Sequence, residues 1–226
     1  MTRLIDHSLD EQAILFIAAM ILFTSFLMLA QKRLTSLVKV FAWQGLLLAI
    51  TTVLCAHIQQ IPHLYFSAAL TLVLKGLLIP RMLGRLIVRF DMHREVEALL
   101  YPSSTLTAAS SLVLFSYYVV LPIEHLSNLA TRNTIAVSLA VVLLGMLMMV
   151  SRRQAIVHVV GFMTIENGLF FAAIAATAGM PMVVELGIAF DVLVAAVIFG
   201  VFFFHISSSI DSLDVDQLNR LSEVER

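Results

Sequence analysis

Seven long apolar segments follow one another along this chain and leave room for little else. Their expected ranges are 12–30, 37–58, 64–87, 105–122, 134–150, 155–178 and 182–206. An α-helix needs about 17–25 predominantly apolar residues to cross the hydrocarbon core of a bilayer. Lipid offers no hydrogen bonds, so a segment of this length satisfies its backbone groups as a helix. The sequence therefore predicts an all-α membrane protein with seven transmembrane helices.

The composition agrees with a chain embedded in lipid. Of the 226 residues, 60% are hydrophobic and 13% are charged, with a mean hydropathy of +0.98, whereas soluble domains are about 45–50% apolar. Cys55 is the single cysteine, which excludes an intrachain disulfide and a multi-cysteine metal or iron–sulfur site. The sequence has no phosphate-binding loop, metalloprotease motif or nucleophile motif. We therefore expect no active site or cofactor in this chain, and no nucleic-acid partner.

The placement of basic residues predicts the orientation in the membrane. Eleven of the 14 Lys and Arg residues fall on alternate connections or on the C-terminal tail, whereas Arg3 and Arg132 fall on the opposite side. Cytoplasmic loops carry an excess of Lys and Arg. We therefore expect the N-terminus outside and the C-terminus in the cytoplasm. The eleven residues are Lys32, Arg33, Lys39, Arg81, Arg85, Arg89, Arg94, Arg152, Arg153, Arg220 and Arg226.

The order of polar positions predicts an internal repeat. A basic pair precedes both "LTSLVKVFAWQGLLLA" and "QAIVHVVGFMTIENGLFFA", and Gln44 stands in the first segment where Glu166 stands in the second. The next helix of each set carries Lys75 or Asp191. This pattern predicts two parallel three-helix repeats joined by a central helix. The expected units are 1–87 (first three-helix unit), 88–132 (cytoplasmic linker and connecting helix), 133–206 (second unit, with the acid pair) and 207–226 (cytoplasmic acidic tail).

Lys75, Glu166 and Asp191 are ionisable residues inside apolar segments. Such groups cost about 2.5–3.5 kcal/mol on insertion scales, and they usually face a bundle interior, a partner or a water path. At about 1.5 Å per residue, Lys75 and Glu166 lie roughly 16 Å, and Asp191 roughly 14 Å, from the starts of their helices. In a core of about 30 Å, all three reach the midplane. The sequence therefore predicts one level of charge in the middle of the membrane.

Two interpretations of this charged level stay open. In the first, the acids take up and release protons, because burial raises a carboxyl pKa and a nearby cation lowers it. In the second, Lys75 and one acid form a fixed ion pair that specifies helix packing. Lys75 is accordingly either a charge carrier or a counter-charge.

Gln44 and His205 are further candidates for an ion path. Gln44 either lines that path or bonds a neighbouring helix, as intramembrane amides do. His205 is 14 residues beyond Asp191, about 40° from its helix face, and is either an inner port for protons or a solvated interfacial residue. The acidic tail 207–226 either packs along a cytoplasmic partner or stays loose in solvent.

Several segments together resemble the hydrogenase-4 component E family. They are "FAWQGLLL", "AALTLVLKGLLIPRML", "TIENGLFF", "VELGIAFDVLVAAVIFGVF" and "LDVDQLNRL". The resemblance implies a membrane subunit of a group 4 nickel–iron hydrogenase or related complex, located in the bacterial cytoplasmic (inner) membrane. It also implies halves that are similar to the three-helix subunit K of respiratory complex I and to its small counterpart in multisubunit sodium/proton antiporters. Subunit K has two intramembrane glutamates. Glu166 matches the first, and Asp191, a shorter acid, matches the second.

The resemblance implies an accessory role in a proton- or sodium-pumping complex. The expected partners are antiporter-like and other membrane subunits and a soluble hydrogenase-like module, with the nickel–iron and iron–sulfur centres in those partner subunits. Two alternatives remain open: a stand-alone secondary transporter or channel with a midplane ionic site, and a structural scaffold. A carboxylate can serve protons and sodium alike, so the residues leave the ion open.

Overall fold

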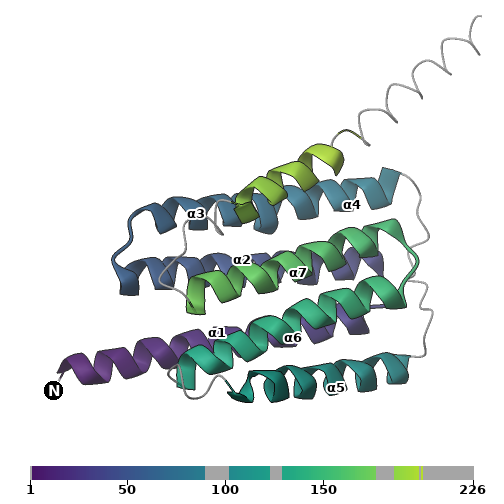
Figure 1. Ribbon diagram of the computed structural model, residues 1–226. Helices are drawn as coiled ribbons and strands as arrows, with labels where there is room; N and C mark the ends of the chain where they lie inside the picture. The colour runs from purple at the N-terminus through teal and green to yellow at the C-terminus, as the bar shows by residue number, and fades with distance from the viewer. Residues whose placement is uncertain (1, 90–101, 123–128, 177–185, 199, 201–226) are drawn as a thin grey trace, which may run out of the picture.

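The computed structural model describes residues 2–89, 102–122, 129–176, 186–198 and 200, and these are helical apart from short connections (Figure 1). A π-helical segment, η1, interrupts the third predicted span, where the sequence predicts one regular helix. The elements are α1 (Thr2–Ala30), α2 (Leu34–Gln59), α3 (His63–Thr71), η1 (Leu72–Leu78), α4 (Ile79–Arg89), α5 (Pro102–Val120), α6 (Leu129–Ser151), α7 (Ala155–Ala176) and the unlabelled helix Leu186–Ile198.

Within the described residues, six helices are long and apolar enough to cross a membrane, and they match the first six predicted segments. The helix Leu186–Ile198 is apolar but shorter. The predicted seventh span covers 182–206, and most of its residues beyond this helix lie outside the described residues. The seventh crossing therefore stays a prediction. The six spans are Gln12–Ala30, Leu34–Gln59, His63–Arg89, Ser103–Val120, Asn133–Ser151 and Ala155–Ile174.

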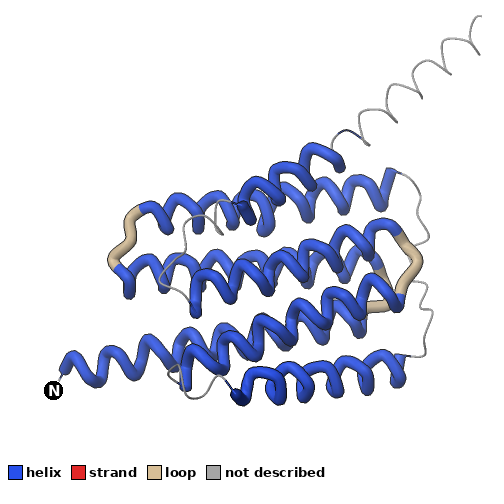
Figure 2. The backbone as a smooth tube through the Cα atoms, viewed as in Figure 1, coloured by secondary structure: helices blue, strands red, loops and turns tan. Residues whose placement is uncertain are grey.

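Helix α2 lies at the centre of one part of the bundle and packs against α1, α3, η1, α4 and α7. Helix α6 packs against α1, α5 and α7, and all these helices run side by side with nearly parallel axes (Figure 1). The connections 31–33 and 152–154 lie at one end of the bundle, and the connection 60–62 lies at the other (Figure 2). The basic pairs in the first two connections therefore share one end, which we call the basic end.

Glycines allow α6 and α7 to approach closely. A Cβ atom at Gly168 would lie 2.9 Å from the carbonyl oxygen of Ser138, and one at Gly145 would lie 2.9 Å from that of Gly161. Small residues at such contacts let backbones pack directly, which is how helices associate in lipid. The contact at Gly168 fixes the depth of α7 beside Glu166.

Arg152 joins the two connections at the basic end. This buried side chain donates a hydrogen bond of 2.7 Å to the carbonyl oxygen of Leu29 and one of 3.4 Å to that of Gln31. Leu29 lies in the last turn of α1 and Gln31 directly follows that helix. The last carbonyls of a helix have no partner in the helix itself and attract a cation. The sequence identifies Arg152 only as one of many basic loop residues, whereas the structure makes it the cap of α1.

Replacing Arg152 with alanine is expected to lower the free energy of unfolding by about 2 kcal/mol, the usual cost of losing hydrogen bonds to a charged group. The neighbouring exposed Arg153 provides the matched control, because its side chain makes no hydrogen bond to the described residues. Heat stability in detergent measures both variants. Equal loss in Arg152→Ala and Arg153→Ala would show that the cap contributes nothing.

Candidate functional site

The structure brings Lys75, Glu166 and Asp191 together in the interior of the bundle. Lys75 is 0% exposed, Asp191 1% and Glu166 7%. The Lys75 ammonium group donates a hydrogen bond to Glu166 Oε2, and its Nζ lies 3.6 Å from Asp191 Oδ1. Residues 75, 166 and 191, predicted only to share a depth, thus form one cluster of a cation between two acids. We call it the charged cluster.

The π-helical segment η1 positions Lys75. A π-turn holds one residue more than an α-turn, and such turns occur frequently at functional sites. Helix α2 packs directly on this segment, because a Cβ atom at Gly45 would lie 2.9 Å from both the Cβ and the carbonyl carbon of Lys75. Gly45 therefore lets α2 close over the backbone of η1 and shield the lysine.

The helix Leu186–Ile198 approaches Glu166 through Gly187. A Cβ atom at Gly187 would lie 2.9 Å from Glu166 Oε1 and 3.1 Å from Phe170 Cδ2. The Phe170 ring centroid in turn lies 5.1 Å from Lys75 Nζ, within the range of a cation–π interaction. The cluster is therefore enclosed by an aromatic ring and by backbone, both of which exclude lipid.

Two amides continue the cluster across the bundle. Lys75 Nζ donates to Asn167 Oδ1 at 2.8 Å, and Asn167 Nδ2 donates to Gln44 Oε1 at 3.0 Å. Gln44 Nε2 donates to Ser25 Oγ at 2.8 Å and to the carbonyl oxygen of Ile21 at 3.3 Å. Gln44 thus meets the cluster through Asn167, and the chain of polar groups ends on α1.

The amides and hydroxyls of this network include residues that sequence analysis did not select. Asn167 is adjacent to Glu166, and an amide beside an intramembrane acid was the signal that could have identified it. Ser25 gave no such signal, because serine in a lipid-facing helix commonly bonds its own backbone. His205 lies outside the described residues, so its predicted role at an inner port stays a prediction.

The charged cluster has one acid more than it has cations. Glu166 Oε1 and Asp191 Oδ1 are buried, and neither has a hydrogen-bond partner in the described part of the chain. Two ionised carboxylates beside one ammonium group carry a net negative charge, which is costly in a buried site. Adding one proton to either acid makes the cluster neutral. The arrangement can therefore hold and exchange a proton.

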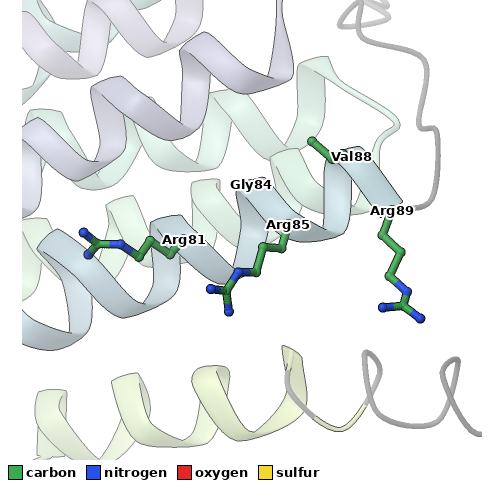
Figure 3. A pocket seen from close by; sticks show the side chains of 5 residues that line it. All are labelled: Arg81, Gly84, Arg85, Val88 and Arg89. Carbon is green, nitrogen blue, oxygen red and sulfur yellow. The ribbon is translucent and has the colours of Figure 1, made fainter.

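Three arginines line a hollow on α4 toward the basic end. Arg81, Arg85 and Arg89 recur every four residues, and with Gly84 and Val88 they line a hollow of about 710 Å³. Their guanidinium groups lie along one side of the helix, while Val88 points to the other (Figure 3). This side of α4 collects basic charge at the same end as the connections 31–33 and 152–154. No group of three or more metal-ligating side chains occurs in the searched, described residues.

Comparisons with known proteins extend over nearly the whole chain. No protein-family model matches the sequence, and no solved structure matches it. An uncharacterized protein of Mycobacterium tuberculosis, Rv0085, is 29% identical over 209 residues, which cover 92% of this chain and 95% of the relative. Hydrogenase-4 component E of Escherichia coli K12 is 25% identical over 205 residues, 91% of this chain and 95% of the relative. The chain is therefore a distant homologue of hydrogenase-4 component E along almost its full length.

Proposed function

We propose that the chain is a membrane subunit of an ion-translocating, hydrogenase-type complex and that its charged cluster forms part of a proton path. Six apolar helices and the similarity to hydrogenase-4 component E support membership of such a complex. The main observation in support of a proton path is that buried Lys75 lies between Glu166 and Asp191. Intramembrane ionisable groups of this kind are typical of proton relays.

The geometry favours a proton over a sodium ion. Lys75 already occupies the position that a cation takes between two carboxylates. A sodium ion would have to displace the ammonium group or lie within a few ångströms of it, where repulsion between like charges in a buried site is strong. A proton adds to a carboxylate oxygen without moving the lysine. We assign Glu166 Oε1 and Asp191 Oδ1 as the acceptors of this proton. Neither oxygen has a hydrogen-bond partner among the described residues.

The full architecture completes this proposal. We propose seven crossings, with the helix Leu186–Ile198 in the seventh, and two three-helix repeats joined by α5. One pair of corresponding positions then meets at the centre, since Lys75 lies beside Asp191. Gln44 bonds Asn167, which is the neighbour of its counterpart Glu166. The arginine side of α4 and the connections 31–33 and 152–154 would face the cytoplasm. The N-terminus would then lie outside.

The partners supply the redox chemistry. We propose that antiporter-like membrane subunits adjoin this chain and that a soluble hydrogenase-like module holds the nickel–iron and iron–sulfur centres. The chain would contribute only charged and polar groups that respond to those subunits. This role explains a charged cluster that is enclosed by packed helices.

Gentle detergent purification of a tagged chain is expected to recover antiporter-like and hydrogenase-like subunits in fixed stoichiometry. A subunit whose protonation changes with the state of a redox module has to stay attached to that module. Mass spectrometry of the intact assembly identifies the partners. A homo-oligomer of this chain that transports ions alone would contradict the proposal and support a stand-alone transporter.

A further inference from the structure

Polar residues recur at every fourth position of the helix that carries Lys75. They are His63, Ser67, Thr71 and Lys75, and they run along α3 into η1. Residues four apart lie on one helix face, about 6 Å apart along the axis. His63 is exposed at the end of α3, whereas the other three are buried. This polar stripe connects the charged cluster with the end of the bundle opposite the basic end.

Thr71 differs from other buried threonines of the chain. Thr24, Thr52 and Thr164 each donate a hydrogen bond of 2.7–2.8 Å to a carbonyl oxygen three or four residues earlier in their own helix. This bond is the usual way in which a hydroxyl is satisfied in a membrane helix. The Thr71 hydroxyl is fully buried, and its oxygen has no partner among the described residues. It is therefore available to a group that is not part of the helix.

A buried water molecule can satisfy such a hydroxyl. Thr71 is one turn from Lys75. Two more buried oxygens, Glu166 Oε1 and Asp191 Oδ1, have no hydrogen-bond partner among the described residues and belong to residues that contact the same lysine. Buried waters usually bond two to four otherwise unsatisfied polar groups. Ser67, the next residue of the stripe, makes only a long bond of 3.4 Å to the His63 carbonyl oxygen, so its hydroxyl can also turn toward water.

We propose that His63, Ser67 and Thr71 line a hydrated inlet, and that Thr71 holds the water molecule that links this inlet to the charged cluster. Each oxygen along the inlet accepts a proton from one neighbour and releases one to the next. The hydroxyls and waters thus regain their starting composition, and the net change is one proton bound to Glu166 or Asp191. The inlet rests on the proposed function and adds to it the end of the bundle at which the cluster exchanges protons with water.

Thiol labelling tests the inlet without relying on transport. Ser67→Cys in the assembled complex should react with a charged, membrane-impermeant methanethiosulfonate from the His63 side, at least about tenfold faster than Ala68→Cys, because a wetted thiol ionises more readily than a dry one. Ala68 is the adjacent buried residue and provides the control. The unmodified chain is the blank, since its single cysteine, Cys55, is buried. Equal labelling at positions 67 and 68, or labelling only from the basic end, would overturn the inlet.

A second set of variants tests Thr71 itself. Thr71→Val removes the hydroxyl at nearly constant size and should slow proton uptake roughly fivefold, the rate equivalent of one lost hydrogen bond, whereas Thr71→Ser should retain uptake. Thr52→Val is the control, because the Thr52 hydroxyl is equally buried but is satisfied within its own helix. Equal uptake by Thr71→Val and Thr52→Val would overturn the role of Thr71.

The two proposals fail in different ways. If Ser67→Cys is not labelled while Glu166→Gln stops pumping, the inlet is wrong and the proton path stands. If Ser67→Cys is labelled while Glu166→Gln pumps fully, the stripe is a wetted surface, and the proton path through the cluster is wrong.

Discussion

Glu166→Gln is expected to assemble at normal levels but to lower proton uptake per electron by roughly tenfold or more, the scale of losing a group that transfers protons. Assembly should persist because Lys75 keeps Asp191 as its counter-charge, 3.6 Å away. Glutamine also preserves the size of the side chain and its capacity to accept a bond from Lys75. Asp191→Asn should behave alike, since it leaves the Lys75–Glu166 pair in place.

The measurement for these two variants is proton uptake into vesicles that contain the purified complex, with subunit stoichiometry determined in the same preparation. Glu166→Asp serves as the matched control, because it keeps the acid and changes only its reach. Redox activity in an uncoupled assay should persist in part in all three variants. Full uptake by Glu166→Gln would mean that the acid serves only packing.

Lys75→Met is expected to reduce the assembled complex to less than about a tenth of its normal level. The change leaves Glu166 and Asp191 facing each other in a buried site without a cation, and removing one partner of a buried ion pair costs about 3–5 kcal/mol. Lys75→Met is therefore far more damaging than the loss of either acid. Lys39→Met on α2 is the control, because Lys39 is exposed and belongs to no ion pair within the described residues.

A double-mutant cycle separates the electrostatic cost from a packing cost. Adding Glu166→Gln to Lys75→Met removes one of the two uncompensated acids and should restore most of the assembly. Adding Asp191→Asn as well should restore it further. If neither addition improves the level of the Lys75→Met complex, the lysine is needed for its shape and not for its charge.

Length, hydropathy and the spacing of charges predicted the first six helices, because each of these segments is apolar over a length sufficient to cross a bilayer. Counting residues along each helix also predicted a common depth for Lys75, Glu166 and Asp191. Counting fixes the depth of a side chain but not the neighbour that it faces. The contacts among residues 75, 166 and 191 therefore had to come from the packing of η1, α7 and the helix Leu186–Ile198.

Other features had no local signal. The π-helical segment around Lys75 packs against α2 at Gly45, a tertiary contact that the sequence of the third helix does not record. Arg152 resembles any cytoplasmic basic residue until its bonds to the end of α1 are seen. Thr71 resembles an ordinary intramembrane threonine, and only its missing partner within the described part of the chain distinguishes it.

Infrared difference spectroscopy of the purified complex tests the central claim most directly. Spectra recorded at high and low pH detect the carbonyl band of a protonated carboxylic acid, and exchange into deuterated water identifies it by its shift. A cluster that exchanges one proton predicts a band that appears at low pH and is weakened or lost in both Glu166→Gln and Asp191→Asn. A band that is unchanged in both variants would show that neither acid takes up a proton, and would contradict the account.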